Sequence, residues 1–359
     1  MGGLGSHLRT SAVTGALRRL NPKVRLVWFT HRRGSELLRY VPGVVAVDVE
    51  SEPVDSGLVR SLDVLLNFEI SSAAARLCGS SRCVGGFALN QHGRFAPAST
   101  HANRLQRLQI DDAYRRRFVG AMQQVLLEAV GLDVPAGYDL ALPHDIRAAG
   151  SDALAMLFSA RLPSPLIGLN IGSSRRGRLK RWPAPYWVTL AGLLTAGDRA
   201  RGVVILSGPE DRDIRDQVAS RLDKNCRQLR VVDGLSVGHF LAVVSELRVL
   251  VTADTFALHA ARAQNVPVVA LAGPMPHREL ELGPADRIIG PELACGPCYY
   301  RCSQPVAGAC MRRITPRAVA TQVEEILGGG QPLAPARCRA RPTYYRGGGG
   351  APRSASRLP

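Results

Sequence analysis

The chain has 359 residues, is 46% hydrophobic and carries a net charge of +17 at pH 7. This length predicts two globular domains. We expect a cytoplasmic protein, because no apolar run approaches the roughly 18 residues of a membrane span and no signal pattern is present. The basic charge favours an anionic substrate or membrane surface over nucleic acid, because aromatic residues are few and no nucleic-acid-binding motif occurs.

The first part of the chain begins with a glycine-rich stretch at residues 2–6. We expect this stretch to be a loop that leads into a helix ending at Asn21 and Pro22. Such a loop normally follows a strand, because the strand fixes where the loop points. Either that strand is absent or the protein starts upstream of Met1, and we expect the second.

Helix and strand patterns alternate from there. They predict strands at residues 24–29, 44–49, 64–68 and 83–87, and helices at residues 32–40, 71–78 and 111–130. The polar and poorly periodic residues 92–109 are predicted to be a loop. Pro135, Gly137 and Pro143 indicate that residues 133–146 link two domains.

The second part repeats the alternation. Its patterns predict strands at residues 166–170, 202–207, 229–232, 249–252 and 266–271, and helices at residues 185–196, 212–222, 237–245, 255–264 and 316–327. We expect the last helix to cross back toward the first domain, and the basic tail at residues 328–359 to be disordered because proline, glycine and arginine dominate it. Two α/β halves joined by a linker predict a cleft that binds a ligand.

Three loops of the second part follow predicted strands, whose carboxyl ends share one edge of a doubly wound sheet. These loops carry Ser173, Ser174, Lys180, Glu210, Asp254 and Thr255. Hydroxyls and a cation suit phosphate, an acidic residue at a strand end can accept from a ribose hydroxyl, and a helix start attracts anions. The three loops together therefore predict a nucleotide diphosphate pocket. By itself, the helix start at Asp254 and Thr255 is equally well explained as an ordinary capped helix.

The second part also resembles glycosyltransferase family 9, which includes the ADP-heptose:lipopolysaccharide heptosyltransferases. The resemblance rests on residues 167–174 (IGLNIGSS), 180–183 (KRWP), 207–211 (SGPED), 251–255 (VTADT), 259–261 (HAA), 267–274 (PVVALAGP) and the cysteine-rich 295–311. In the first part, residues 5–10 (GSHLRT) and 16–18 (ALR) look like the family's first loop and helix.

The resemblance implies an α/β fold of GT-B architecture, in which two Rossmann-like domains face each other across a cleft. Residues 1–140 would be the acceptor domain, with its first strand missing, and residues 147–327 the donor domain. The implied reaction moves a heptose, with inversion, from ADP-heptose to the anionic lipopolysaccharide inner core, and it needs no metal or other cofactor. We expect a monomer in peripheral contact with the inner face of the plasma membrane, and no nucleic-acid partner.

The resemblance also implies which residues hold the donor. These are Ser173, Ser174, Lys180, Glu210, Asp254, Thr255, Phe256 and His259. Cationic and N–H groups at this place would stabilise the charge that develops on the leaving ADP. Taken as a lone histidine, His259 is more readily explained by packing than by catalysis.

Two residues depart from the family pattern. Ser6 stands where the family has the aspartate that acts as the catalytic base, and a serine hydroxyl is no base near neutral pH. His7, with an ordinary pKa of roughly 6.5, is the expected replacement. Phe256 stands where the family has glycine, and its ring would crowd the diphosphate or demand a different donor. The alternative to an active enzyme is therefore a catalytically impaired homologue that binds nucleotide sugars.

A cluster of four cysteines, Cys295, Cys298, Cys302 and Cys310, has a spacing close enough for zinc or an iron–sulfur centre. The resemblance does not bring a metal with it, so we expect reduced structural cysteines, with zinc as the secondary option.

Overall fold

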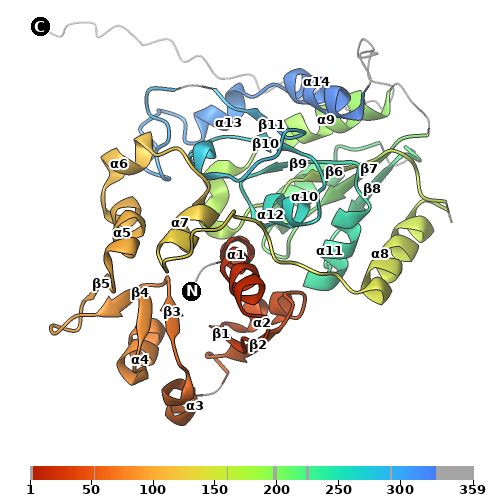
Figure 1. Ribbon diagram of the computed structural model, residues 1–359. Helices are drawn as coiled ribbons and strands as arrows, with labels where there is room; N and C mark the ends of the chain where they lie inside the picture. Colours follow the sequence, from red (N-terminus) through yellow and green to blue (C-terminus); the bar gives the residue numbers. More distant parts are fainter. Residues whose placement is uncertain are drawn as a thin grey trace, which may run out of the picture.

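The computed structural model describes residues 3–51, 53–159, 161–196, 200–223, 226–291 and 293–328 (Figure 1). The strands are β1 (Leu26–Thr30), β2 (Val44–Asp48), β3 (Leu65–Asn67), β4 (Val84–Leu89), β5 (Phe95–Pro97), β6 (Leu166–Asn170), β7 (Gly202–Leu206), β8 (Leu229–Val232), β9 (Val249–Ala253), β10 (Val268–Leu271) and β11 (Arg287–Ile289). The predicted tail from residue 329 on lies outside the described residues.

The helices alternate with these strands along most of the chain. The α-helices are α1 (Leu4–Leu20), α2 (Arg32–Leu38), α3 (Ser56–Ser61), α4 (Ser72–Ser80), α5 (Asn103–Ile110), α6 (Asp112–Arg117), α7 (Met122–Glu128), α8 (His144–Leu157), α9 (Ala184–Thr195), α10 (Arg212–Ala219), α11 (Val237–Ser245), α12 (Phe256–Ala263), α13 (Ala309–Arg313) and α14 (Pro316–Leu327). Short 3-10 helices cover Thr100–Ala102, Arg175–Lys180 and His277–Glu279. Among the described residues, no helix is both long enough and apolar enough to cross a membrane.

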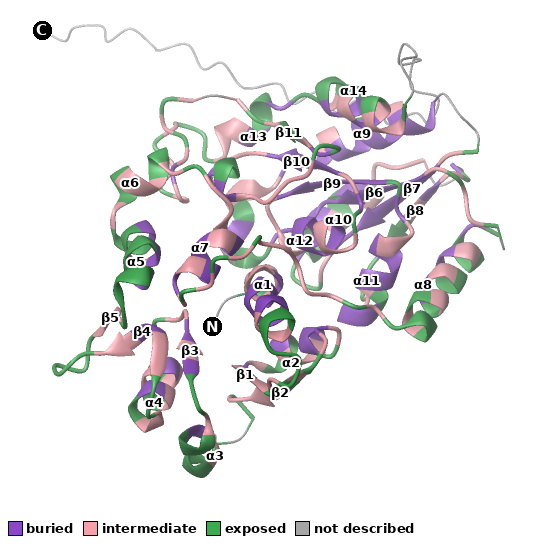
Figure 2. Ribbon diagram, viewed as in Figure 1, coloured by how far each residue is buried: buried purple, intermediate pink, exposed green. Residues whose placement is uncertain are grey.

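The second half is built on one parallel sheet with the strand order β11-β10-β9-β6-β7-β8. This is the order of a doubly wound sheet. The order of the strands reverses between the neighbouring strands β6 and β9, which is the topological switch point. Every residue of β6, β7, β9 and β10 is buried (Figure 2), as expected for near-continuous apolar runs covered on both faces. The loops after β6 and β9 therefore flank the crevice in which such sheets bind ligands.

Helices cover both faces of this sheet. One core contains Trp182, Trp187 and residues of α9, α10 and α14, and the other contains residues of α8, α11 and α12. The expectation that the last helix crosses to the first domain is wrong. Val319, Ala320 and Val323 of α14 are buried in the first of these cores, and α14 lies against α9 and β9 to β11.

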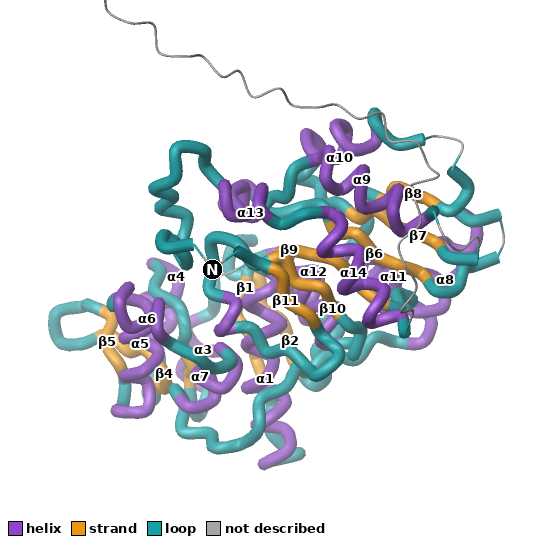
Figure 3. The backbone as a smooth tube through the Cα atoms, turned by 90° about the horizontal axis from the view of Figure 1, so that it is seen from above, coloured by secondary structure: helices purple, strands orange, loops and turns teal. Residues whose placement is uncertain are grey.

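The first half carries two smaller sheets. β1 and β2 form a parallel pair, whereas β3 pairs in parallel with β4 and β4 antiparallel with β5. Helix α1 lies between the halves, where it contacts α7 of the first half and α12 of the second. Seen from above, β4 and β5 lie at one side of the molecule and β7 and β8 at the other (Figure 3). The strand expected upstream of Met1 lies outside the described residues.

Several predicted elements of the first half differ in the structure. Helix α1 already begins at Leu4, so Gly5 and Ser6 are helical rather than part of a loop. The predicted loop at residues 92–109 contains β5 and α5, and α5 is held by the buried Leu105 and Leu108.

The predicted helix at residues 111–130 and the predicted linker also differ. The helix is divided into α6 and α7 because Gly120, at a φ of 152°, donates its N–H to the carbonyl of Arg278 instead of continuing the helix. The linker at residues 133–146 ends early, since α8 begins at His144. The elements α3, α8, α13 and β11 had no prediction.

Candidate functional site

A cavity of about 480 Å³ opens between the two halves at the carboxyl ends of β6, β7 and β9. The wall from the first half consists of Gly3, Leu4, Gly5, Ser6, Arg9, Arg33 and Arg115. The ionisable side chains of this wall are all arginines. The wall from the second half contains carboxylates, hydroxyls and Lys180 together with an apolar side, so the cavity joins an arginine-rich face to a mixed one.

The cavity brings together every predicted site residue except His7. Its lining includes Ser6, Ser173, Ser174, Lys180, Glu210, Asp254, Thr255, Phe256 and His259. The spacing of the strand-end loops predicted this gathering, because β6 and β9 are neighbours at the switch point of the sheet.

The structure places His7, the expected replacement base, outside the cavity lining. His7 lies on the face of α1 that packs against β1. Its side chain is buried and stacks on Trp28 with 5.8 Å between ring centroids. Nδ1 lies 3.1 Å from the carbonyl of Gly3, and Nε2 lies 2.5 Å from Oγ1 of Thr30. Burial lowers the pKa of His7. Both ring nitrogens are thus occupied, because the helical phase of α1 turns His7 toward β1 while Ser6 faces the cavity.

The centre of the donor side is an ion pair between Lys180 and Asp254. The Lys180 ammonium lies 3.1 Å from Oδ2 of Asp254 and donates to the Asp254 carbonyl at 2.5 Å. Burial is the largest influence on both pKa values and opposes both charges, but the ion pair together with Tyr300 at Lys180, and with His259 and Arg9 at Asp254, outweighs it. The pKa of Asp254 is therefore lowered and that of Lys180 is raised. The ring of Tyr300 lies 5.8 Å from the same ammonium. The pair therefore stays ionised across the neutral range.

The start of α12 is open. Thr255 occupies the N-cap position, but its side chain makes no cap hydrogen bond. Its hydroxyl instead lies 3.2 Å from Nδ2 of Asn170 and 3.1 Å from the hydroxyl of Thr252. The interpretation of this stretch as an ordinary capped helix is therefore wrong. A helix start without a side-chain cap leaves N–H groups that can bind an anion.

Ser173, Ser174 and Glu210, the remaining predicted polar residues, differ in whether their side chains already have hydrogen-bond partners. The hydroxyl of Ser173 donates to the carbonyl of Gly177 at 2.9 Å, so it shapes the loop after β6. Ser174 is exposed on the cavity wall. Glu210 is also exposed, accepts from the backbone N–H of Arg175 at 3.0 Å and faces Arg33 at 3.9 Å.

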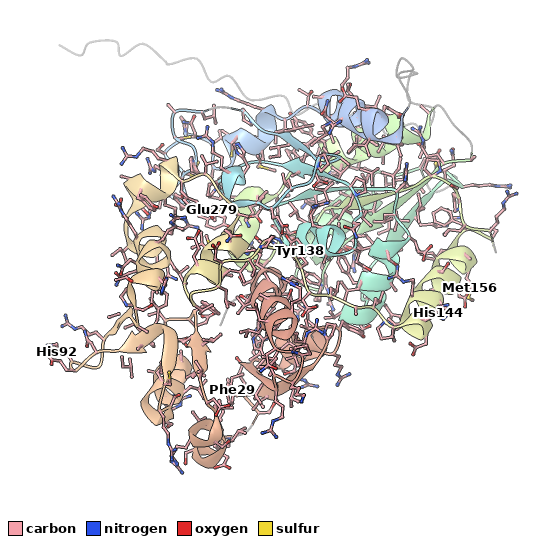
Figure 4. The ribbon with its side chains drawn as sticks, in the orientation of Figure 1. Phe29, His92, Tyr138, His144, Met156 and Glu279 are labelled. Atoms are coloured by element: carbon pink, nitrogen blue, oxygen red, sulfur yellow. The ribbon has the colours of Figure 1, made fainter. Side chains whose placement is uncertain are left out.

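The arginines of the first-half wall were missed from the sequence. Arg9 lies one helical turn after Ser6 and approaches its hydroxyl at 3.3 Å, so the helical period of α1 could have revealed it. Arg115 belongs to a run of three arginines whose other members, Arg116 and Arg117, are exposed, so the run itself gives no sign of a contact. The Arg115 guanidinium pairs with the buried Glu279 at 3.1 Å and lies 4.2 Å over the ring of Tyr299. These contacts join the halves at one side of the cavity, and Figure 4 labels Glu279 among them.

His259 is buried and belongs to a connected polar group. Nδ1 lies 2.9 Å from the hydroxyl of Tyr138, and Nε2 lies 3.7 Å from Oδ1 of Asp254. Burial, and then Arg9, lower the pKa of His259 to about 3, so the ring is neutral. Tyr138, in the segment that joins the halves, was not predicted because its partner is 121 residues away in sequence.

Phe256 forms the apolar side of the cavity. Its ring centroid lies 5.4 Å from that of Phe240, and both rings pack against a cluster that includes Leu8 of α1 and Leu241 of α11. The Phe256 ring therefore forms an apolar wall of the cavity at the start of α12, between the two halves.

The clustered cysteines Cys295, Cys298, Cys302 and Cys310 are free thiols. Burial raises the pKa of Cys298 and Cys310, whereas backbone N–H groups lower that of Cys302. In the part of the chain that the structure describes, no group of three histidine, cysteine or acidic side chains is placed to hold a metal ion.

Comparisons with known proteins place this chain in a family. The model of glycosyltransferase family 9 (heptosyltransferase) matches residues 66–305. Lipopolysaccharide heptosyltransferase 1 of Pseudomonas aeruginosa is 28% identical over 229 residues, which are 60% of this chain and 62% of that protein. The chain thus matches somewhat less than two thirds of that relative's length.

Solved structures extend the likeness in fold to most of the chain. A glycosyl transferase family 9 protein from Veillonella parvula superposes with a TM-score of 0.65 at 18% identity, covering 91% of this chain and 95% of the other. ADP-heptose lps heptosyltransferase II of Escherichia coli gives 0.63 at 19%, covering 91% and 96%. The predicted α/β fold of GT-B architecture is confirmed, and the chain belongs to glycosyltransferase family 9, the heptosyltransferase family.

Proposed function

We propose that this protein is a glycosyltransferase that moves a heptose from ADP-heptose to the lipopolysaccharide inner core with inversion. One observation carries the proposal: the ionised Lys180–Asp254 pair stands beside an open helix start in a cavity at the switch point of a doubly wound sheet. The name of the E. coli relative, which specifies ADP-heptose, supports this choice of donor.

On the donor side, the diphosphate would lie against the start of α12. The backbone N–H groups after Thr255 and the hydroxyl of Ser174 would donate to its oxygens, and Lys180 would supply positive charge. Glu210 stands at the end of β7, where a carboxylate can accept from ribose hydroxyls. These groups are fixed before the reaction, so they would stabilise the charge that grows on the leaving ADP and would do so without a metal ion.

On the acceptor side, the arginine wall favours an anion. Arg9 and Arg33 reach the cavity from α1 and α2, and the closest acidic contact of Arg33 is Glu210 at 3.9 Å. A phosphorylated or carboxylated lipid sugar would neutralise these charges. The net charge of +17 would also draw the protein to the anionic inner face of the plasma membrane, where it would work as a peripheral cytoplasmic monomer.

Among the residues that the structure describes, the proposed site lacks an evident base to remove the proton of the acceptor hydroxyl. Ser6 lines the cavity, and its hydroxyl cannot act as a base near neutral pH. Each cavity carboxylate has another partner: Lys180 for Asp254, Arg115 for Glu279, Arg181 for Asp211 and a backbone N–H for Glu210. This arrangement favours a second candidate function, a homologue that binds the nucleotide sugar without turnover.

One experiment tests the proposal and separates the two candidates. ADP release is measured after the purified protein is mixed with ADP-heptose, with and without a lipopolysaccharide inner-core acceptor. The transferase releases ADP only when the acceptor is present, and Lys180→Ala reduces that release. ADP binding without release in the presence of acceptor would leave the non-catalytic binder, and no ADP binding would reject both.

A further inference from the structure

The segment that joins the two halves is held against α1 by hydrogen bonds and an ion pair of Asp139. The carboxylate of Asp139 pairs with Arg18 at 2.6 Å and accepts from the hydroxyl of Thr14 at 3.2 Å. The Asp139 backbone N–H donates to the hydroxyl of Ser11 at 2.9 Å. These contacts fix the backbone next to Tyr138, so the direction of the Tyr138 side chain is set by α1.

From this anchored position Tyr138 reaches His259, which lines the donor side of the cavity. The Tyr138 hydroxyl lies 2.9 Å from Nδ1 of His259, and the side chain lies between α1 and α12 (Figure 4). Burial, and then the Glu281 carboxylate, raise the pKa of Tyr138, so the phenol keeps its proton. Two neutral side chains therefore share one hydrogen bond in a buried place.

The other side of the imidazole decides the direction of that bond. Nε2 of His259 faces Oδ1 of Asp254 at 3.7 Å, and an ionised carboxylate can only accept. A neutral imidazole carries one proton, so the proton belongs on Nε2 and Nδ1 must accept. The hydroxyl of Tyr138 is then the donor, and the polar chain runs from Tyr138 through His259 to Asp254.

We propose that Tyr138 is a positioning residue of the donor site, which donates to Nδ1 of His259 and so holds the Nε2–H toward the Asp254 carboxylate that anchors Lys180. The effect on donor binding rests on the proposed function, whereas the hydrogen-bond order does not. Ligand-binding histidines are commonly oriented in this way, through a hydrogen bond on the nitrogen opposite the functional one.

The consequence is a link between the halves. Lys180, Asp254 and His259 belong to the second half, while Tyr138 is held by α1, whose first turn carries Ser6 on the acceptor side. A shift of α1 would therefore move the hydroxyl that orients His259. The segment between α7 and α8 thus couples the position of α1 to the donor site.

The test is nitrogen-15 NMR of the imidazole rings in the full chain, with His259→Asn used to assign the His259 signals. In the wild type we expect a proton on Nε2 and an unprotonated Nδ1 that accepts a hydrogen bond. Tyr138→Phe should move the Nδ1 resonance toward that of a nitrogen without a donor. Tyr186→Phe is the matched control, because it removes a hydroxyl that donates to the carbonyl of Arg312 outside the cavity, and it should leave His259 unchanged.

A proton on Nδ1 in the wild type would overturn the proposal without any variant, and so would an Nδ1 resonance that Tyr138→Phe leaves in place. ADP affinity is measured by calorimetry on the same samples. Loss of one hydrogen bond should weaken ADP binding roughly fivefold in Tyr138→Phe, with no change in Tyr186→Phe. If the wild type binds no ADP, the proposed function fails while the NMR result still decides the hydrogen-bond order. If ADP binds equally to wild type and Tyr138→Phe, the positioning role fails alone.

Discussion

At the scale of single residues, the pairing of buried charges decides which side chains of the cavity are ionised. Asp254 is surrounded by Lys180, His259 and the start of α12, and it keeps its charge although burial opposes it. His259 instead loses its charge, because burial lowers its pKa to about 3. One ionised pair beside one neutral ring gives a fixed local field at the place where a diphosphate would lie.

The neutral state of His259 has a consequence for stability. Its pKa is about 3 in the folded protein and ordinarily about 6.5, so between these values the unfolded chain binds a proton that the folded chain does not. The free energy of unfolding should therefore fall as the pH drops below about 6.5, by at most about 1.4 kcal/mol per pH unit from this residue. Urea unfolding at several pH values measures the slope.

The control compares two histidine substitutions. His259→Asn should flatten this slope, while His92→Asn, at the exposed tip between β4 and β5, should keep it (Figure 4). The buried His7 contributes in the same direction in all three proteins, because its pKa is also lowered. Parallel slopes for wild type and His259→Asn would show that His259 is not held neutral.

Ser6 allows a gain-of-function test. An aspartate at this position would face the cavity from the first turn of α1 and could act as the missing base. Ser6→Asp should raise the rate of acceptor-dependent ADP release by about 100-fold, the lower end of what a placed general base contributes. Ser6→Asn, with a similar shape but no basic group, should not raise the rate. Equal rates for both variants would contradict the assignment of Ser6 as the site of the missing base.

At the scale of elements, the crossing of α1 and α12 forms the centre of the molecule. Gly5 lies where the two helices meet, and a Cβ added there would stand 2.9 Å from Cδ2 of His259 and 3.5 Å from Cα of Phe256. A larger residue would have to separate the helices, because both contacts are to buried or backbone atoms.

Substitution of Gly5 by alanine tests this crossing. Gly5→Ala should lower the free energy of unfolding by about 1–3 kcal/mol through overpacking, although alanine is the better helix former. Gly79→Ala in α4 is the control, because a Cβ there would meet nothing within 4 Å, and it should stabilise by up to about 1 kcal/mol. Chemical denaturation measures both. A stable Gly5→Ala protein would mean that the helices do not cross as closely as described.

The same elements explain how much the sequence could predict. The strands β6 to β10 of the second half were predicted well, because runs such as β6, β7 and β9 are apolar and bounded by turn residues, whereas the short β11 was not predicted. The start of α1 was missed because packing on α12 makes residues 4–6 helical although the sequence has glycine at positions 2, 3 and 5. The break between α6 and α7 depends on Gly120 bonding to Arg278, a contact 158 residues apart that no local pattern contains.

The residues of the candidate site also divide into those that local sequence patterns could predict and those that depend on contacts with distant segments. The donor-side residues stand at strand ends of a regular sheet, so spacing located them. Tyr138 and Arg115 act through partners from the other half of the chain, and their local sequence gives no signal for this.

At the scale of the whole molecule, the halves are joined on both sides of the cavity. One side is the apolar cluster around Leu8 and Phe256, and the other is the ion pair of Arg115 with Glu279, to which Gln123 and Glu281 add a hydrogen bond of 2.8 Å. The cavity is therefore flanked on two sides by contacts between segments that are distant in sequence.

Removal of Arg115 tests the polar side of this junction. Arg115→Ala leaves the buried Glu279 without its partner and should cost about 2–4 kcal/mol in the free energy of unfolding, less than a fully buried pair because Arg115 is partly exposed. Arg116→Ala, which changes an exposed neighbour on the same helix, should stay within about 0.5 kcal/mol of wild type. Equal stability of the two variants would contradict the role of the ion pair.

The central claim is that the cavity binds a nucleotide diphosphate sugar through the Lys180–Asp254 pair and the start of α12. Calorimetric titration of ADP-heptose into the wild type and into Lys180→Met tests it most directly. The account predicts saturable binding to the wild type and an affinity at least about tenfold lower for Lys180→Met, since a charge-assisted contact to phosphate is lost. No binding to the wild type, or equal affinity for the two proteins, would contradict it.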